Sequence, residues 1–403
     1  MKKPLLIASV FTLLLFLNSC KKDEKESVIP EPTETESQFV RLLASDQDLV
    51  NYYIINPQKG TYESQAGQFA NGSLYSSPSG RFVSVINTST NFATFFDSGI
   101  EEHDDHAHIK GTPKWTLTSA NGTTPIHYYG RGDDMLIFND GDGSISHFKE
   151  STLHSEANAR TFAVGIAHHG APALFNNNTI AVTEKDGSAS GTLPERVKVV
   201  DMDGNILHAS TIQTGGIHGE AGNGELVLFG STNGILMVTN NGSQELINYP
   251  GSLGTNWLGS VYYGKESHQF VGFKSKYGLY KIDPISKTIT SIEENGNLFS
   301  VTFDWEGHDL IVLYTDGTVK VLDGHDLSVI SSKNLGVNFP ASGSKGNPVV
   351  AASENYVYIT DGINGKILMY KKDTLEKVKE IILPGKPSKI ALMGSLAKED
   401  SSH

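Results

Sequence analysis

Short apolar segments recur along the chain from about residue 39, and each is followed by a polar or glycine-containing turn and a second apolar segment. The segment Met135–Phe138, for example, is followed by the turn Asn139–Gly143 and by Ser144–Phe148. Short runs rich in Val, Ile, Phe and Tyr, separated by Asp-Gly or Asn-Gly turns, are typical of strands joined in hairpins. The first segment recurs at 50–55, 82–86, 135–138, 178–182, 225–229, 269–273, 310–314 and 356–359.

The even spacing of these eight copies predicts the fold class. They recur roughly every 46 residues, within the period of about 40–50 residues that four-stranded propeller blades show. We therefore expect an all-β protein, a β-propeller with eight blades, with seven blades as the alternative. The segment 387–393 is a single predicted strand after the last copy. We expect it to close the ring by joining the first blade, which lacks its own inner strand.

The N-terminal region predicts export and a lipid anchor. A basic start, an apolar run at 5–17 and the sequence Leu-Asn-Ser-Cys ending at Cys20 resemble a bacterial lipoprotein signal. The apolar run is too short to span a membrane. We expect cleavage before Cys20 and lipidation of this residue; an ordinary secretory signal is the alternative. The charged residues 21–24 resemble surface-export signals, which predicts a cell-envelope protein anchored to the outer membrane and facing the periplasm or the exterior.

These features divide the chain into four predicted parts. Residues 21–37 are rich in charged residues and Pro and have few apolar side chains, so they cannot bury enough surface to fold. The predicted parts are a lipoprotein signal peptide at 1–19, the lipidated cysteine with a disordered tether at 20–37, the propeller domain at 38–395 and a disordered tail at 396–403.

Composition excludes several classes of function. The formal net charge is −13, and binding to a nucleic-acid backbone requires a basic surface. Cys20 is the single cysteine, so the folded part has no disulfide, no thiolate metal site and no thiol nucleophile. Phosphate-binding glycine loops and dinucleotide-binding turns are also absent from the sequence.

The densest group of potential metal ligands is the run from His103 to His108. Ten of the 14 histidines fall between residues 103 and 218, and this run follows two glutamates. Neutral imidazole suits Zn²⁺, and residues two apart on an extended segment face the same way. We predict metal contact in this run, with His103, Asp105, His106 and His108 as candidate ligands. The alternative is a solvated polar loop between blades.

A second group is defined by position within the repeat. His127, His169 and His218 occupy the same point in the strand that opens each of three successive blades. First strands of propeller blades line the central channel, so these imidazoles should converge and supply three of the four ligands that zinc prefers. Glu220 is a further candidate, as a ligand or as an acceptor that orients an imidazole. His168 points away from the channel or replaces His169. Hydrogen-bonded structural histidines are the alternative for each.

The loop histidines precede the blade that carries His127, so His106 or His108 could supply the fourth ligand. An incomplete ligand set finished by a mobile loop would suit exchange of the metal better than permanent storage. Because protons compete for imidazole nitrogens, the affinity should fall as the pH drops through the imidazole range.

Several segments carry a resemblance to a known family. The segments 95–99, 167–170, 195–204 and 217–221, in this order and spacing, resemble the periplasmic zinc metallochaperones of the AztD type, and the similarity spans most of residues 40–395. The resemblance implies a β-propeller that is not an enzyme, that binds Zn²⁺ and that passes it to the solute-binding protein of a zinc ABC importer. It implies as zinc ligands His106, His108, His127, His169 and His218.

Two features depart from this family and leave other roles open. Some relatives carry a histidine-rich N-terminus, whereas residues 21–37 contain no histidine. This protein is also predicted to be lipid-anchored, whereas members of the family are free in the periplasm. Zinc capture at the cell surface is therefore an equal alternative to hand-off. A metal-dependent hydrolase or lactonase-like propeller would need a substrate pocket beside the metal. A protein-interaction propeller would bind no stoichiometric zinc.

Overall fold

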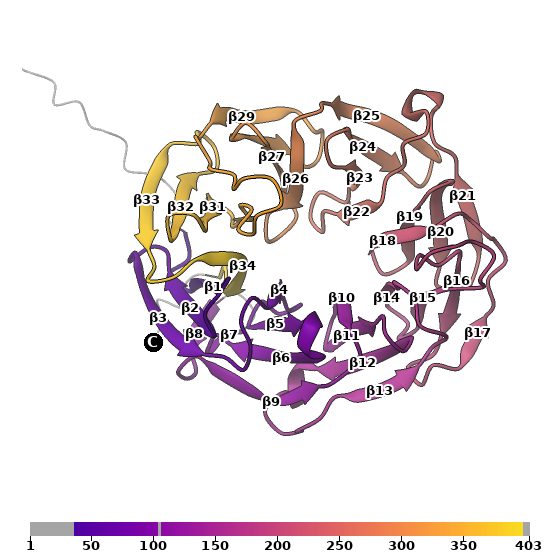
Figure 1. Cartoon of the computed structure of the whole chain (residues 1–403), viewed down its shortest axis with the longest axis horizontal. Helices are drawn as coiled ribbons and strands as arrows, with labels where there is room; N and C mark the ends of the chain where they lie inside the picture. Colours follow the sequence, from indigo (N-terminus) through magenta and orange to yellow (C-terminus); the bar gives the residue numbers. More distant parts are fainter. Residues whose placement is uncertain (1–35, 104–105, 398–403) are drawn as a thin grey trace, which may run out of the picture. The chain divides into compact units, whose positions relative to one another are not determined.

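A computed structural model describes residues 36–103 and 106–397, which form eight four-stranded antiparallel sheets arranged as the blades of a ring (Figure 1). The prediction of an all-β, eight-bladed propeller is confirmed. Among the described residues the strands are accompanied by three single-turn 3-10 helices: η1 (Thr88–Thr90), η2 (Glu150–Thr152) and η3 (Gly251–Leu253). The described part of the chain contains no helix that is long and apolar enough to cross a membrane.

Each blade begins at the central channel and extends outward through four strands. Blade one consists, in this order, of β34 (Pro387–Gly394), β1 (Val40–Asp46), β2 (Asn51–Asn56) and β3 (Thr61–Ala66). Blade two consists of β4 (Ser73–Ser76), β5 (Phe82–Asn87), β6 (Phe92–Asp97) and β9 (Lys114–Ala120), and a hairpin of β7 (Ile100–His103) and β8 (His106–Ile109) is inserted before β9. Blade three consists of β10 (Pro125–Arg131), β11 (Asp134–Asn139), β12 (Ser144–Lys149) and β13 (Arg160–Ala163). Blade four consists of β14 (Pro172–Leu174), β15 (Ile180–Glu184), β16 (Arg196–Val200) and β17 (Ile206–His208).

The remaining blades follow the same plan without insertions. Blade five consists of β18 (Ile217–Gly222), β19 (Leu226–Ser231), β20 (Gly234–Thr239) and β21 (Gln244–Ile247). Blade six consists of β22 (Ser260–Tyr263), β23 (Phe270–Lys274), β24 (Gly278–Asp283) and β25 (Thr288–Glu294). Blade seven consists of β26 (Leu298–Phe303), β27 (Asp309–Tyr314), β28 (Thr318–Asp323) and β29 (Val329–Asn334). Blade eight consists of β30 (Val350–Ala352), β31 (Tyr356–Asp361), β32 (Lys366–Lys371) and β33 (Lys377–Ile382).

The recurring apolar segments lie one strand away from the channel in seven blades. They are the second strands, which are buried on both faces between neighbouring blades and therefore read as continuous apolar runs. The segment 50–55 differs, because it lies in β2, the third strand of blade one. The second strand of that blade is β1, since the innermost position is taken by β34 from the other end of the chain.

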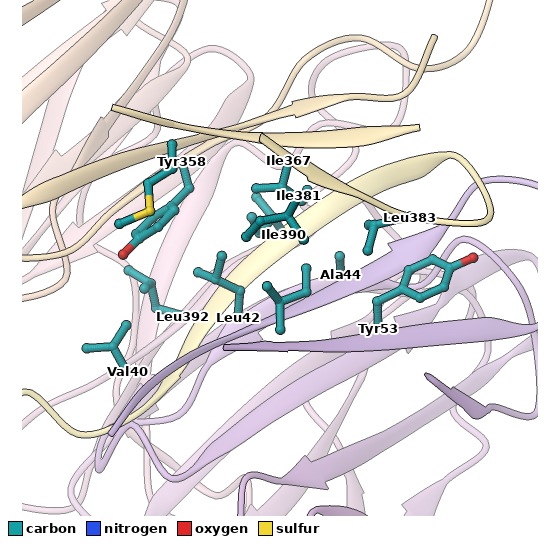
Figure 2. Close-up of a cluster of buried hydrophobic side chains, with 12 residues drawn as sticks. Val40, Leu42, Ala44, Tyr53, Tyr358, Ile367, Ile381, Leu383, Ile390 and Leu392 are labelled. Atoms are coloured by element: carbon teal, nitrogen blue, oxygen red, sulfur yellow. The ribbon is translucent and has the colours of Figure 1, made fainter. Parts of the chain in front are cut away.

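The C-terminal strand closes the ring, as the sequence predicts. β34 pairs with β1 along its length, from Val40 opposite Gly394 to Asp46 opposite Pro387. The apolar face of blade one then packs against blade eight (Figure 2). The cluster joins residues from both ends of the sequence: Val40, Leu42, Ala44, Tyr53, Ile55, Tyr358, Ile367, Met369, Ile381, Leu383, Ile390 and Leu392.

Packed residues extend two positions beyond each predicted domain boundary. Glu36 is buried and its Oε2 accepts a hydrogen bond from the hydroxyl of Ser353 at 2.7 Å. Ser37 donates to the carbonyl oxygen of Ala397 at 2.6 Å, so the two ends of the described part are joined. The predicted signal peptide, Cys20, residues 20–35 of the predicted tether and residues 398–403 of the predicted tail lie outside the described residues.

The direction of the inner strands divides the ring into two faces. The chain enters blades two to eight through their innermost strand, and each blade has four antiparallel strands, so these innermost strands run in the same direction. In blade one β34 takes this place, antiparallel to β1. We call the face where these strands begin the entry face, and the face where they end the exit face. In blade two, β6 ends opposite the beginning of β5, because Asp97 pairs with Phe82. The β7–β8 hairpin therefore leaves the blade at the exit face.

Candidate metal centre

Three histidines converge at the entry face of the channel, one from each of blades three, four and five. We call His127, His169 and His218 the channel triad. His127 lies near the start of β10 and His218 near the start of β18, whereas His169 lies in the turn just before β14 rather than in a strand. Their ring centroids lie 4.8, 5.1 and 5.9 Å apart. The structure thus brings together the three residues that the repeat register selected.

His127 and His218 each lie in a β-bulge of an inner strand. Between Pro125 and Tyr128, β10 advances three residues while β11 advances two, and His127 lies within this extra segment. β18 makes the same irregularity between Ile217 and Glu220, which places His218 at the equivalent point. Because a bulge bends the strand and redirects a side chain, these two irregularities turn both imidazoles from the sheet face toward the channel.

The distance between two of the imidazoles matches a shared metal ion. Nε2 of His127 lies 3.2 Å from Nε2 of His169. Two nitrogens bound to one tetrahedral zinc at about 2.0–2.1 Å lie roughly 3.3 Å apart. The pair is therefore spaced as two ligands of one ion, with the ring of His218 beside both.

A carboxylate fixes His169. Asp140, in the turn after β11, places Oδ2 2.5 Å from Nδ1 of His169, and its Oδ1 accepts from the backbone N–H of Gly170 at 3.3 Å. A Cβ at position 170 would lie 2.3 Å from the ring of Phe138, so only glycine fits between Phe138 and the turn that holds Asp140. With Nδ1–H donating to Asp140, the lone pair of Nε2 points into the triad, which is the arrangement of metal-binding histidines in proteins.

A backbone carbonyl fixes His218. Nδ1 of His218 lies 3.0 Å from the carbonyl oxygen of Gly259, in the segment before β22. A Cβ at Gly219 would lie 2.7 Å from the same oxygen, so the small residue lets blades five and six come this close. The hydrogen bond assigns the proton to Nδ1 and leaves Nε2 of His218 as an acceptor.

The tautomer of His127 follows from its neighbours. Because Nε2 of His169 is an acceptor, the 3.2 Å contact requires Nε2–H of His127 to donate in the metal-free protein. A metal ion would replace that proton, and the neutral ring would then carry its proton on Nδ1. Oε2 of Glu220 lies 3.8 Å from this atom and is placed to approach it. At this distance Glu220 makes no hydrogen bond to His127, so it lies beside the triad as a candidate acceptor and is not part of it.

Burial keeps His127 and His218 in the form that binds metals. Burial, with smaller contributions from the neighbouring His169 and His218, lowers the pKa of His127 to about 3. Burial also lowers the pKa of His218. Both imidazoles are neutral at pH 7, so a metal ion need not displace their charge. The side chains of His127 and His169 keep exposed fractions of 18% and 22%, which leaves the triad accessible from the channel.

The lowered pKa of His127 predicts a pH-dependent stability. Unfolded histidine takes up a proton near pH 6.5, whereas folded His127 does not until about pH 3. The unfolded chain therefore binds more protons in this window, and the free energy of unfolding falls as the pH decreases below about 6.5. Between pH 7.5 and 5.5 we expect zinc-free His127→Gln to lose about 1 kcal/mol less than wild type, measured by urea unfolding. Equal losses in both proteins would contradict the assignment.

His168 does not belong to the triad. It is buried against Phe138, its Nδ1 lies 2.7 Å from the carbonyl oxygen of Ile166, and its Nε2 lies 3.0 Å from the hydroxyl of Thr183. Both ring nitrogens are therefore occupied by the protein. Of the two alternatives that the sequence left open, the structure shows the one in which His168 points away from His169.

The β7–β8 hairpin presents a second group of potential ligands. Pairing of Glu101 with His108 and of His103 with His106 places all four side chains on one face of the hairpin. The ligand atoms of Glu101, His103 and His108 lie within 4.8 Å of one another. The opposite face is anchored by buried Ala107. Asp105 lies outside the described residues.

Two cations occupy the carboxylate of this second group. Glu101 accepts from Arg81 at 2.9 Å and from Lys110 at 2.6 Å, and its pKa is lowered mainly by the hydrogen bond from Lys110. The side chains of His103 and His108 are about half exposed. A metal ion would have to displace Lys110 from Glu101 before it could bind. We therefore expect this group to bind a metal ion more weakly than the channel triad does.

The hairpin and the triad do not form one site. The triad lies where β10, β14 and β18 begin, at the entry face, whereas the hairpin packs where β34 ends, through Ile100 beside Gly394 and Glu102 hydrogen-bonded to Ser395 at 2.5 Å. The expectation that His106 or His108 supplies the fourth triad ligand is therefore wrong. The hairpin and His127 are close in sequence but not in space, because β9 runs from the exit face to the entry face between them.

Sequence reasoning missed Asp140 and Gly259. The pattern around Asp140 predicts only a hairpin turn, although the turn after a second strand faces the start of the next blade, where His169 lies. This place in the repeat was the one feature of the sequence that could have indicated Asp140 as a partner of His169. The carbonyl of Gly259 acts through its backbone, so no residue type marks it. Arg81, which holds Glu101, lies 20 positions before it and was equally hidden.

A curated protein is similar to this chain along its whole length. No protein-family model matches the sequence. The zinc chaperone AztD of Citrobacter koseri is 25% identical over 414 aligned residues, which cover 100% of this chain and 96% of AztD. The resemblance inferred from the sequence segments is confirmed.

Solved structures share the fold. The crystal structure of Citrobacter koseri AztD superposes with a TM-score of 0.79 at 22% identity and covers 89% of this chain and 98% of that chain. A structure of apo AztD gives the same TM-score. The dihydro-heme d1 dehydrogenase NirN in complex with DHE superposes with a TM-score of 0.62 at 15% identity, covering 89% of this chain and 76% of that chain. At these identities the structures show a common propeller fold.

Proposed function

We propose that this protein is a zinc metallochaperone that binds Zn²⁺ at the channel triad and passes it to a zinc-binding protein of an uptake system. The observation that carries the proposal is the triad itself, in which two Nε2 atoms lie 3.2 Å apart and the rings of His169 and His218 are oriented through their Nδ1 atoms. Similarity to a zinc chaperone over the whole chain supports the same function.

The geometry suits binding followed by release. Three imidazoles supply an incomplete tetrahedral set, which leaves one position for water or for a ligand from a partner. His127 is the member whose Nδ1 has no hydrogen-bond partner among the described residues, since Glu220 lies 3.8 Å away. We assign to His127 the first bond broken during transfer. The ion then moves to the partner's ligands stepwise, without entering solution as a free ion.

A transfer experiment tests the function. Zinc-loaded protein is mixed with a zinc-free periplasmic zinc-binding protein while excess chelator traps any released ion. We expect the acceptor to gain zinc faster than the chelator removes zinc from the donor alone. Transfer no faster than that dissociation would reduce the protein to a zinc-binding protein without chaperone activity.

Asp140→Asn should weaken zinc binding although every ligand remains. Loss of the carboxylate frees the ring of His169 and lowers the basicity of its Nε2, and removal of such orienting groups typically costs 10–100-fold in metal affinity. We expect a decrease in this range in a competition titration. The matched control is Asp142→Asn, because Asp142 lies in the same turn but contacts Ser144 rather than the triad. An unchanged affinity of Asp140→Asn would contradict the assigned role.

The hairpin group should bind a second, weaker zinc ion. We propose Glu101, His103 and His108 as its ligands, with Lys110 displaced from Glu101. The double variant His103→Ala/His108→Ala should lose the weaker equivalent in a calorimetric titration, whereas the affinity of the tighter site should change by less than about threefold because the two sites lie on opposite faces. A matched loss of the tighter site would show that the two groups act together.

A hydrolytic role is less well supported. A large pocket does reach Glu220 from the exit face, but none of the three triad histidines is among its lining residues. A substrate bound there would not contact a metal ion at the triad, so we propose transport of zinc rather than metal-assisted hydrolysis.

We further propose that the protein works in the cell envelope, anchored through lipidated Cys20. The proposal rests on the sequence of residues 1–20. Labelling of growing cells with an alkyne fatty acid should mark the wild-type protein and leave Cys20→Ala unmarked. Labelling of the variant would place the modification elsewhere.

A further inference from the structure

The exit face of the channel contains a pocket that the zinc site does not use. It has a volume of about 940 Å³ and lies where the inner strands of blades three, five and six end. Its lining includes Tyr129, Arg131, Glu220, Tyr262, Tyr263 and Lys265. This volume lies in the range of small-molecule sites, which typically measure about 300–1,000 Å³ and combine aromatic walls with a few polar groups.

Arg131, the last residue of β10, lines this pocket and has no carboxylate partner in residues 36–103 and 106–397. Its Nη2 donates to the carbonyl oxygen of Gly222 at 3.0 Å and its Nη1 to the amide oxygen of Asn176 at 3.2 Å. Its Nε is buried and has no hydrogen-bond acceptor among the described residues. Neutral oxygens therefore hold the guanidinium in place, but its charge is not balanced by an ion pair within 4.0 Å in the described part of the chain.

A second cation, also without an ion pair to the described residues, lies at the rim of the same pocket. Lys265 follows β22, is exposed, and forms no ion pair with the described carboxylates. Two acidic residues also line the pocket, but neither is paired with these cations. Glu220 faces His127 at 3.8 Å, and Glu266 is exposed at the rim.

We propose that this pocket binds a small organic carboxylate, with the carboxylate on Arg131 and its organic body against the aromatic wall. A guanidinium held by neutral acceptors still presents N–H groups in the planar arrangement that matches a carboxylate, and charge-assisted bonds of this kind are stronger than neutral ones. Tyr262 and Tyr263 provide apolar surface for the ligand body, and Lys265 provides a second contact for a polar substituent. The ligand is thus an organic anion with a carboxylate for Arg131 on an apolar frame, which can carry a second carboxylate for Lys265.

Calorimetric titration of the full-length, zinc-free protein tests the proposal independently of zinc binding. The probes are benzoate, glutarate, inorganic phosphate and benzamide, which has the shape of benzoate without its charge. We expect saturable binding of benzoate and glutarate, and binding of benzamide and phosphate at least tenfold weaker. No saturable binding of either carboxylate, or tighter binding of phosphate, would overturn the proposal.

Substitutions place the binding within the pocket. Arg131→Gln should weaken benzoate binding at least tenfold, and Lys265→Gln, which changes an exposed side chain and should leave the fold intact, should weaken glutarate binding two- to fivefold. Arg160→Gln is the matched control, because Arg160 lies on the outer strand β13 and pairs with Asp203. Unchanged binding in a folded Arg131→Gln protein would overturn the proposal. If Arg131→Gln does not fold, unchanged glutarate affinity in Lys265→Gln would overturn it.

Discussion

Replacement of His127, His169 and His218 by alanine is expected to abolish tight zinc binding while the propeller stays folded. Four-ligand zinc sites bind with apparent free energies of about 10–16 kcal/mol, which is roughly 3 kcal/mol for each ligand. Each single substitution should therefore cost about 100-fold in affinity, and the triple variant should fall below detection in a competition titration with a chromophoric chelator. The three side chains line the channel and belong to none of the hydrophobic core clusters of the described residues. Their loss should therefore leave thermal unfolding cooperative.

A matched triple variant controls for the general loss of imidazoles. His208, His308 and His325 are exposed and lie outside both candidate sites. Their replacement by alanine should leave the tight zinc equivalent unchanged. Tight binding retained by a folded triad variant would contradict the channel site and would transfer the tighter equivalent to the β7–β8 hairpin.

Removal of β34 should prevent the ring from closing. A chain that ends before Pro387 leaves β1 with an unpaired edge and removes Ile390 and Leu392 from the cluster shared with blade eight, together with buried Met393. Loss of each buried aliphatic side chain costs about 2–5 kcal/mol, and the sum reaches the whole stability of about 5–15 kcal/mol of a typical domain. We expect a protein that aggregates or shows no cooperative unfolding by circular dichroism.

Two controls separate strand loss from chain shortening. A chain that ends at Ala397 keeps β34 and should unfold like the wild type. Leu392→Ala should remain folded but lose about 2–5 kcal/mol, whereas Ile382→Ala, at a side chain that is 67% exposed, should change stability by less than about 0.5 kcal/mol. A truncated protein that unfolds cooperatively near the wild-type temperature would show that the eight blades do not depend on this closure.

The hydrophobic pattern was sufficient to predict the architecture of this protein. Second strands are buried on both sides, so each blade leaves an apolar run at the same spacing, and the lone run at 387–393 had to pair with another blade. The triad was predictable for a related reason. A ring with repeated blades brings equivalent positions of the inner strands to the same level, which places His127 and His218 together. His169 joins them from the turn just before the inner strand of blade four, so the shared position in the repeat still identified all three residues.

The tertiary structure alone decided which ligands belong together and how they are held. The hairpin ligands lie close before His127 in sequence, yet they are on the other face, because one blade spans the thickness of the ring. Asp140 orients His169 across a blade boundary, and the carbonyl of Gly259 does the same for His218. Neither contact leaves a periodic signal, since each depends on the packing of one blade against the next. The missing partner of Arg131 is likewise a property of the packed channel, because only there can it be seen that no described carboxylate reaches the guanidinium.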